Sequence, residues 1–459
     1  MMVLVEQVRE IWNAGVAAVR ADRLVDETIR LDDYYLHLGD VAIERAQFDR
    51  LLIVGAGKAV AAMAVAVDRA LSREIPTYGW VNVPDGTIDG LSQPNGEIRI
   101  FAARPAGINE PTELVIEGTR KILNLVRSAT PRELTLVLLS GGGSALLASP
   151  SPGVSLADKL TVIRHLSGRG ANIEQLNTVR KRLSEVKGGG LARECHSGQL
   201  VTLVLSDVLG DPLDVIASGP TVASRSTPAD AMKVLNQYDP ERILPAAIYR
   251  VIESQRAALL PIRAGLCVVL ANNATAVDAA GIRAEQLGFS HAMTAATRPE
   301  GSAESVGIHH AEMAISMLRD RDAGKSTPDC LITGGEPTVQ LVPAEIRGRG
   351  GRNTHLVLAA MKRLHELQIA SSSLDRIAIL SGGTDGEDGP TDAAGAILSA
   401  NVWQNASRLQ LDPVDYLARN DSYSFFQQAG GLMITGPTHT NVCDVRVVAV
   451  SPASDVTSG

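Results

Sequence analysis

Short apolar runs recur along the chain and predict buried β-strands. Six of them read LLIV, LTLVLL, VTLVL, CVVL, CLI and IAIL, and their Val, Ile and Leu content is typical of strands covered on both faces. The stretches between them, such as AVAAMAVAVDRAL and ATAVDAAGIRAEQLG, have apolar residues at the spacing of amphipathic helices. This alternation predicts an α/β protein with mostly parallel strands.

The chain is long enough for more than one domain. A single hydrophobic core rarely keeps growing beyond about 250–300 residues, and this chain has 459. Residues 228–263 lack a clear strand and read as helices, with KVLNQY and AAIYRVIES at amphipathic spacing. We therefore expect one domain over residues 1–235 and a second over residues 236–459, with the option that the last segment packs back on the first domain.

Glycine and polar residues follow each predicted strand. LLIV leads into GAGK, LTLVLL into SGGGSA, VTLVL into SDVLGD, CVVL into ANNAT, CLI into TGGEPT and IAIL into SGGTDGED. Ligands of open α/β sheets bind beyond the carboxyl ends of the strands, where glycine lets the backbone approach and helices present unpaired N–H groups. Ordinary αβ turns also contain Gly and Asp, but six such turns favour a large polar site.

The overall composition favours a small-molecule partner. A formal charge of −8 and an aromatic content of 3% argue against nucleic acid as a partner. No apolar run is long enough for a membrane span, and four scattered cysteines without a CxxC pair suit a reducing compartment. We expect a cytoplasmic protein without a membrane partner, and the sequence leaves open whether it forms a homodimer.

Lys58 lies at the predicted start of a helix, directly after Gly55 and Gly57. The dinucleotide pattern GxGxxG would need glycine where Val60 stands, and the spacing of a Walker A loop is also absent. A cation is disfavoured at a helix amino terminus unless an anion lies there with it. Lys58 is therefore a candidate ligand for a phosphate or carboxylate.

Two further turns of the first half could bind anions. In SGGGS, the residues from Ser140 to Ser144 place consecutive amides in a tight turn of the kind that forms an anion nest. Ser144 could instead be an acyl-transfer nucleophile, but GxSxG and an obvious partner histidine are missing. The stretch VRKRLSEVKGGG, which begins just before Arg180, places Lys187 against three glycines as the best cationic ligand candidate.

Acidic residues at strand ends are candidate magnesium ligands. Asp207 follows a buried strand, and Asp385 and Asp388 lie in the acidic glycine loop SGGTDGEDGPTDAAGA. Mg²⁺ takes one or two carboxylates together with water and substrate phosphates. One of these acids could alternatively orient an attacking hydroxyl group. Arg352 lies on a glycine loop that suits bidentate binding of anions.

The ordered motifs also resemble a known family, the class II glycerate 2-kinases. They stand here as GAGKAV, LSGGGSALL, VKGGGLA, LSDVLGDPLDVIASGPT, GGEPTV, GGRN, GTDGEDGPTDAAGA, NDSYSFF and TGPTHTNVCD, spread over nearly the full chain. The resemblance implies a Rossmann-like α/β/α amino-terminal domain with a mostly parallel sheet and a smaller carboxyl-terminal α/β domain of MOFRL type. It also implies ATP- and magnesium-dependent phosphorylation of the 2-hydroxyl of D-glycerate, or of a related sugar acid, in the cleft between the domains.

The motifs and the resemblance together define the expected site. Catalytic roles are expected for Lys58, Arg352, Asp207 and Asp385, and metal ligation for Asp207, Asp385 and Asp388. Substrate or nucleotide binding is expected for Gly55, Gly57, Ser140, Gly141, Gly142, Gly143, Ser144, Lys187, Ser218, Gly219, Glu336, Asn353, His355, Thr435, His439 and Asn441.

Four residues depart from the usual family pattern and concern the acceptor. They are Arg104, Thr354, His355 and His439, and the two histidines and the arginine could hold a carboxylate. Two other functions stay open: an NAD(P)H-dependent hydroxypyruvate reductase, prompted by the partial GxGxx pattern, and a nucleotide-binding sensor without turnover.

Overall fold

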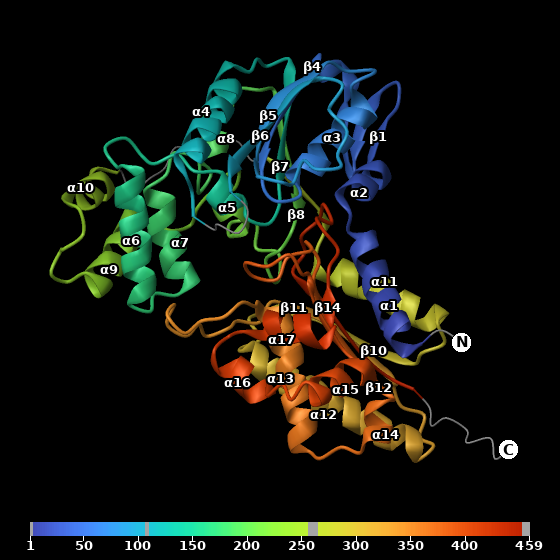
Figure 1. The fold of residues 1–459 in the computed structure, drawn as a ribbon. Helices are drawn as coiled ribbons and strands as arrows, with labels where there is room; N and C mark the ends of the chain where they lie inside the picture. Colours follow the sequence, from blue (N-terminus) through green and yellow to red (C-terminus); the bar gives the residue numbers. More distant parts are fainter. Residues whose placement is uncertain (1–2, 106–109, 256–264, 452–459) are drawn as a thin grey trace. The chain divides into compact units, whose positions relative to one another are not determined.

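The computed structural model describes residues 3–105, 110–255 and 265–451, which form two compact units. The central unit comprises Ala21–Leu270, and the terminal unit combines Met1–Arg20 with Ala271–Gly459. Figure 1 shows both units coloured along the sequence. Each unit has its own six-stranded sheet, so the expected α/β class is confirmed.

The sheet of the central unit brings the first three polar turns to one edge. Its strand order is β6-β5-β4-β7-β8-β9, and the pairs β4–β5, β5–β6, β4–β7 and β7–β8 are parallel. The strands are β4 (Arg50–Ala56), β5 (Thr77–Pro84), β6 (Glu97–Arg104), β7 (Glu133–Leu139), β8 (Gln199–Leu205) and β9 (Leu266–Ala271). Because neighbouring parallel strands end together, the turns after β4, β7 and β8 lie side by side.

Helices cover both faces of this sheet (Figure 1). The crossover from β4 through α3 (Val60–Leu71) runs toward β5, whereas that from β6 through α4 (Glu113–Ser128) runs back to β7. Right-handed crossovers in opposite directions place the two helices on opposite faces. Val115 and Ile122 of α4 share one core with Leu52, Val54 and Val137 of the strands.

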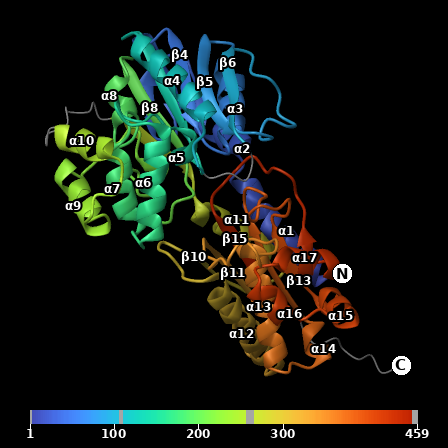
Figure 2. The ribbon, with the colours of Figure 1, turned by 60° about the vertical axis from the view of Figure 1, so that its left-hand side comes forward.

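The rest of the central unit consists of short elements and a helical cluster. A separate antiparallel sheet contains β1 (Ile29–Leu31), β2 (Tyr35–Leu38) and β3 (Val41–Glu44), flanked by α2 (Ala21–Thr28) and η1 (Arg45–Gln47). The central unit also contains three short helices, α5 (Gly143–Leu146), α8 (Gly190–Glu194) and η2 (Ile216–Ser218). The helices α6 (Leu156–Gly168), α7 (Ile173–Arg182), α9 (Pro228–Tyr238) and α10 (Ala246–Ser254) gather around a core of their own (Figure 2).

The sheet of the terminal unit is mixed rather than mostly parallel. Its order is β10-β11-β15-β12-β13-β14; β10 and β11 are parallel, and every other neighbouring pair is antiparallel. The strands are β10 (His291–Ala295), β11 (Cys330–Gly335), β12 (Ile377–Gly383), β13 (Gly395–Leu398), β14 (Leu432–Met433) and β15 (Asp444–Val450). The last strand, β15, therefore lies between β11 and β12 in the middle of the sheet.

Helices cover both faces of this sheet as well. One face packs on α12 (Ala303–Asp322) and α13 (Arg352–Glu366), whose core includes Leu356, Ile379 and Val448. Around them lie α14 (Ser371–Leu374), α15 (Ala400–Arg408), α16 (Pro413–Ala418) and α17 (Ser422–Ala429). The other face is covered by α11 (Asn273–Gln286) and by the first helix of the chain, α1 (Leu4–Ala18).

The division of the chain differs from the expected boundary between residues 235 and 236. The helices α9 and α10 share a core with α6 and α7, and β9 extends the first sheet, so the central unit continues to residue 270. The final strand, β15, lies in the sheet of the terminal unit, and the first helix, α1, belongs to the same unit. Residues 256–263 of the predicted helical segment lie outside the described residues.

No helix in the described part of the chain has the length and apolar character that a bilayer span requires.

Candidate functional site

The turns after β4 and β7 are bonded to each other. Lys58 N donates to the carbonyl of Gly141 at 2.8 Å, and Ala59 N donates to Ser140 Oγ at 3.0 Å. A Cβ on Gly57 would lie 2.2 Å from Ser140 Oγ, so only glycine permits this approach. The GAGK and SGGGS motifs therefore form one structure at the edge of the sheet.

Two cationic side chains flank this paired turn. Gly142 has a φ of 77°, and a Cβ there would lie 3.6 Å from Lys58 Cγ and 3.7 Å from Arg104 Nη2. Arg104 is 2% exposed. It lies beside this turn although it is distant from both motifs along the chain. Backbone amides with two adjacent cations are suited to holding an anionic group. The sequence identified Lys58 and the turn as anion ligands, and it offered Arg104 as a residue that could hold a carboxylate.

Lys187 lies beside Ser144 and Ser218. Its Nζ donates to Ser144 O at 2.7 Å, to Ser144 Oγ at 2.8 Å and to Ser218 Oγ at 3.4 Å. Burial, followed by the charges of Lys159 and Arg180, holds the pKa of Lys187 well below its usual value. Ser144 Oγ thus contacts a lysine and a serine, rather than the histidine that an acyl-transfer triad would require.

The loop after Lys187 is fixed by the IASGPT turn. Gly188 N donates to Ser218 O at 3.0 Å, and Gly189 N donates to Gly219 O at 2.7 Å. Ala217, Ser218 and Gly219 have φ values of 50°, 63° and 61°, and the left-handed region is costly for the first two. These backbone bonds offset the strain and hold the Ser218 hydroxyl toward Lys187.

In the terminal unit, Asp444 connects two of the predicted motifs. It is the first residue of β15, where it pairs with Gly335 at the end of β11 and with Gly383 at the end of β12. An antiparallel strand starts where its neighbours finish, so Asp444 lies beside both the GGEPT and the SGGTDGED turns. Asp444 is one of several polar residues near the end of the sequence, and its role could not be predicted because the pairing of β15 is not visible in the sequence.

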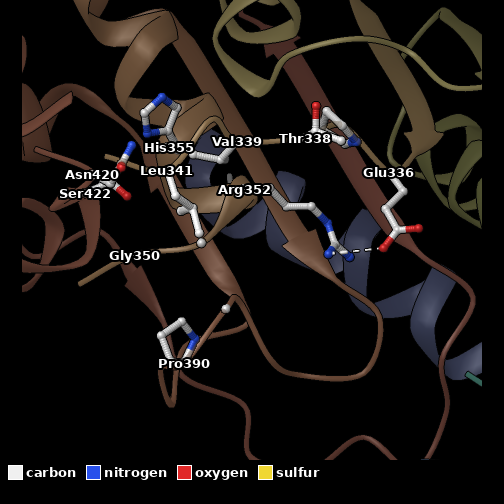
Figure 3. Close-up of a pocket in the computed structure, with 13 residues that line it drawn as sticks. Glu336, Thr338, Val339, Leu341, Gly350, Arg352, His355, Pro390, Asn420 and Ser422 are labelled. Carbon is white, nitrogen blue, oxygen red and sulfur yellow. Dashed lines mark ion pairs between the residues drawn. The ribbon is translucent and has the colours of Figure 1, made fainter. Parts of the chain in front are cut away.

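Arg352 is held between carboxylates. Its Nε and Nη2 donate to Asp444 Oδ2 and Oδ1 at 2.7 and 2.9 Å, and its Nη1 lies 3.2 Å from Glu336 Oε1 (Figure 3). Burial opposes the charge of Arg352, but the charges of Asp444, Glu336 and Asp385 outweigh it and hold the pKa of Arg352 above its ordinary value. Arg352, Glu336 and Asp385 are therefore neighbours, as the motifs predicted.

Asp388 caps α13 from outside the helix. Its Oδ1 accepts from Asn353 N at 2.8 Å, and its Oδ2 accepts from Thr354 N at 2.8 Å and from Thr354 Oγ1 at 2.7 Å. The carboxylate is 1% exposed, and both oxygens are engaged by the helix. This arrangement gives Asp388 a structural task and leaves it poorly placed for the metal ligation expected from the sequence.

A pocket of about 440 Å³ opens beside Arg352. Figure 3 shows Arg352 reaching toward Glu336, with His355 and Ser422 also on the lining. Burial lowers the pKa of His355 below its usual value, so at neutral pH the ring is uncharged. The idea that His355 binds a carboxylate as a cation therefore loses its support, and a hydrogen-bonding role is the alternative.

The other predicted residues of this unit lie on the loops around Arg352. A Cβ on Gly386 would lie 3.0 Å from Thr435 Oγ1, and Asn441 Oδ1 accepts from Cys443 N at 3.4 Å. His439 has a φ of 59°, in the left-handed region that favours glycine.

The predicted residues thus fall into two groups, one in each unit. The group of the central unit contains Lys58, Ser140, Gly141, Gly142, Gly143, Ser144, Lys187, Ser218 and Gly219, with Asp207 after β8. The group of the terminal unit contains Arg352, Asn353, His355, Glu336, Asp385 and Asp388. Among the described residues, no cluster of three or more His, Cys, Asp or Glu side chains has the arrangement of a metal site.

Comparison with known proteins agrees with this organisation. Residues 7–253 match a domain of unknown function called DUF4147, and residues 329–444 match the MOFRL family. Glycerate kinases of Rattus norvegicus and Homo sapiens are 36% and 35% identical to the chain, over 98% of it and 94% of each relative. A protein of Agrobacterium vitis named putative hydroxypyruvate reductase is 38% identical over 87% of the chain and 99% of its own length.

A solved structure is similar over the same extent. The crystal structure of glycerate kinase from Thermotoga maritima matches with a TM-score of 0.79 and 34% identity, covering 98% of this chain and 99% of that one. The chain therefore belongs to the glycerate kinase family with DUF4147 and MOFRL domains.

Proposed function

We propose that the protein transfers the γ-phosphoryl group of ATP to the 2-hydroxyl of D-glycerate or of a closely related sugar acid, with Mg²⁺ as cofactor. The observation that carries the proposal is the paired GAGK–SGGGS turn with Lys58 against it, together with glycerate kinases as full-length relatives. Phosphoryl transfer needs positioned cations and amides more than it needs a covalent intermediate.

The central unit supplies the groups that suit phosphate oxygens. The turn from Ser140 to Ser144 supplies backbone amides, and the side chain of Lys58 lies beside Gly142 of that turn. Lys187 is fixed by Ser144 and Ser218, so its ammonium group keeps one orientation. In the proposed reaction, Lys58, Lys187 and the amides of the turn bind and orient an anionic substrate group.

The terminal unit supplies a fixed guanidinium. Asp444 and Glu336 hold Arg352 in one orientation, so its charge requires no reorganisation when negative charge develops on the transferred group. Glu336 and Asp385 are carboxylates beside that charge, which is a donor set that fits a magnesium ion also bound by nucleotide phosphates. When bound, the ion would neutralise phosphate charge.

A carboxylate must also accept the proton of the acceptor hydroxyl or orient it. Asp207 follows β8 in the central unit, and Asp385 follows β12 in the terminal unit. Both remain candidates for this task, and both were also proposed as metal ligands. We propose a catalytic role in phosphoryl transfer for Lys58 and for Arg352.

The test is a panel of three- and four-carbon sugar acids with ATP. ADP release is measured with and without Mg²⁺, and phosphorus NMR of the product identifies the hydroxyl that was phosphorylated. Release of ADP only with D-glycerate, giving 2-phosphoglycerate, is the expected result. Lys58→Met and Arg352→Met should each lower kcat about 10²–10³-fold. Failure of every acid to stimulate ADP release would refute the kinase proposal.

The name of the Agrobacterium vitis relative makes a reductase the second candidate. The turn after β4 has Val60 where a dinucleotide fingerprint has its third glycine, and Gly57 packs on Ser140 instead of facing a pyrophosphate. Oxidation of NADH with hydroxypyruvate, measured on the same preparation, decides between the two functions.

A further inference from the structure

A small cationic pocket lies in the central unit between the SGGGS turn and the helices α6 and α7. It has a volume of about 90 Å³ and is lined by Lys159, Arg180 and Lys187, with Ser144 and a few apolar side chains. A pocket of this size holds a few water molecules, so it suits a single carboxylate or phosphate group. No carboxylate is among its lining residues.

The position of Lys159 on its helix is unusual. Val162 and Leu166 follow it by three and seven residues on α6, and both lie in the core of the helical cluster. Lys159 therefore occupies the apolar face of the helix, where the pattern of the sequence would place a Leu or Val. A lysine at such a position suggests a task other than solubility.

The charges around the pocket are not balanced by the described part of the protein. Lys159 is 2% exposed and its Nζ has no hydrogen-bond partner among residues 3–105, 110–255 and 265–451. The Nε of Arg180 also lacks one within these residues. Lys181, the next cation along the chain, is paired with Asp214 and so belongs to a different arrangement. Lys159, Arg180 and Lys187 thus direct three positive charges at one small space.

Burial of unpaired like charges is unfavourable, and the structure reflects this. Burial and the charge of Arg180 lower the pKa of Lys159 to about 8, and the same causes lower that of Lys187. An anionic group in the pocket would remove both penalties at once, since it would neutralise the cations and accept their hydrogen bonds. Ser144 and Ser218 already orient Lys187 and keep its ammonium group on the pocket wall.

We propose that Lys159, Arg180 and Lys187, with Ser144, form a binding site for a single oxyanion group, the carboxylate or a phosphate of a substrate. The assignment to a substrate rests on the proposed kinase function, whereas the binding of the anion does not. Lys159 belongs to no motif of the site predicted from the sequence, and Arg180 had no assigned role within the stretch VRKRLSEVKGGG. The site therefore extends the anion-binding surface of the central unit toward α6 and α7.

The first experiment measures anion binding without catalysis. Inorganic phosphate is titrated into the full-length protein by calorimetry, and the melting temperature is recorded with and without phosphate. Lys159→Met keeps the length of the side chain and removes the charge, and Lys121→Met removes an exposed lysine of α4 as the matched control. We expect Lys159→Met to bind one phosphate fewer per chain, to melt at a higher temperature without phosphate, and to lose the rise that phosphate causes. The control should behave as the unaltered protein does.

The second experiment identifies the source of the anion. D-Glycerate and ATP are titrated separately into the same proteins and into Arg180→Met, which tests the pocket should Lys159→Met fail to fold. Glycerate binding weakened at least tenfold with unchanged ATP binding assigns a carboxylate, and the reverse assigns a nucleotide phosphate.

Two outcomes separate this proposal from the kinase proposal. Unchanged binding of phosphate, glycerate and ATP in both Lys159→Met and Arg180→Met would overturn the oxyanion site even if the protein is a kinase. Lost phosphate binding in these variants would support the site even if no sugar acid stimulates ADP release.

Discussion

At the scale of single residues, Arg352 has two tasks that can be separated. It neutralises Asp444, which is fully buried, and it directs a guanidinium at the adjacent pocket. Arg352→Met leaves the buried carboxylate uncompensated, which should lower the free energy of unfolding by about 3–5 kcal/mol. Arg352→Met with Asp444→Asn should recover much of that loss, since the remaining amide is neutral.

Activity should not recover in the double variant. Urea denaturation measures stability, and ADP release measures turnover, in the unaltered protein and in both variants. Restored stability with kcat still depressed about 10²–10³-fold separates catalysis from folding. If turnover returned together with stability, Arg352 would have only a structural role.

The lowered pKa of Lys159 predicts how the stability of the protein depends on pH. Its pKa is about 8 in the folded protein and ordinarily 10.5, so between these values the unfolded chain binds more protons and stability rises with pH. Below pH 8 both states are protonated, and the full cost of the buried charge, about 3 kcal/mol, is present. Lys159→Met should therefore be more stable than the unaltered protein at pH 7, and the difference should shrink from pH 8 to 10. A pH-independent difference in urea denaturation would contradict the lowered pKa.

Individual site residues were predictable where a local pattern carried them. Lys58 and the SGGGS turn were found because glycine and charge follow a strand directly, and the structure bonds the two motifs. Lys159 was missed because it lies inside an amphipathic helix, without a glycine turn or a strand end next to it. Its role depends on the packing of α6 against α7, which no local pattern specifies.

At the scale of elements, the start of α13 depends on Asp388. The carboxylate accepts three hydrogen bonds from Asn353 and Thr354, so Asp388→Ala should destabilise the protein by about 1–2 kcal/mol, as for other lost helix caps. The Mg²⁺ concentration that the Asp388→Ala variant needs for half-maximal ADP release should stay unchanged. Asp385→Asn should instead raise the Mg²⁺ concentration needed for half-maximal ADP release. If Asp388→Ala raised that concentration and Asp385→Asn did not, the two assignments would be exchanged.

The elements themselves followed the hydrophobic pattern, but their order in the sheet did not. Each of the six apolar runs is a strand, as predicted. Burial on both faces, which the composition also predicted, fails for β9, where Val269 is 37% exposed. The antiparallel insertion of β15 between β11 and β12 was not predictable, since the sequence of a buried strand does not reveal its neighbours. That insertion creates the contact between Asp444 and Arg352, so the surroundings of Arg352 were only partly predicted.

At the scale of the whole molecule, the terminal unit joins the two ends of the chain. Val8, Ile11 and Trp12 of α1 are buried, and Trp12 Nε1 donates to the carbonyl of Gly382 at 3.2 Å. Gly15 allows close packing, since a Cβ there would lie 2.8 Å from the carbonyl oxygen of Ala276. A boundary drawn from composition keeps α1 with the nearest strands along the chain, which is why the discontinuity of the terminal unit was not predicted.

This connection predicts which part of the protein a mutation in the first helix destabilises. Trp12→Ala leaves a cavity beside β12 and should lower the free energy of unfolding by about 3–5 kcal/mol. The terminal unit should open locally before the central unit does. Hydrogen exchange measured by mass spectrometry should accelerate in β12 and β15, whereas amides of β4 and β7 should keep their protection. Ile53→Ala, a buried change on β4, is the matched control and should produce the opposite pattern. Accelerated exchange in β4 and β7 alone after Trp12→Ala would mean that α1 stabilises the central unit, and the discontinuous division of the chain would then be incorrect.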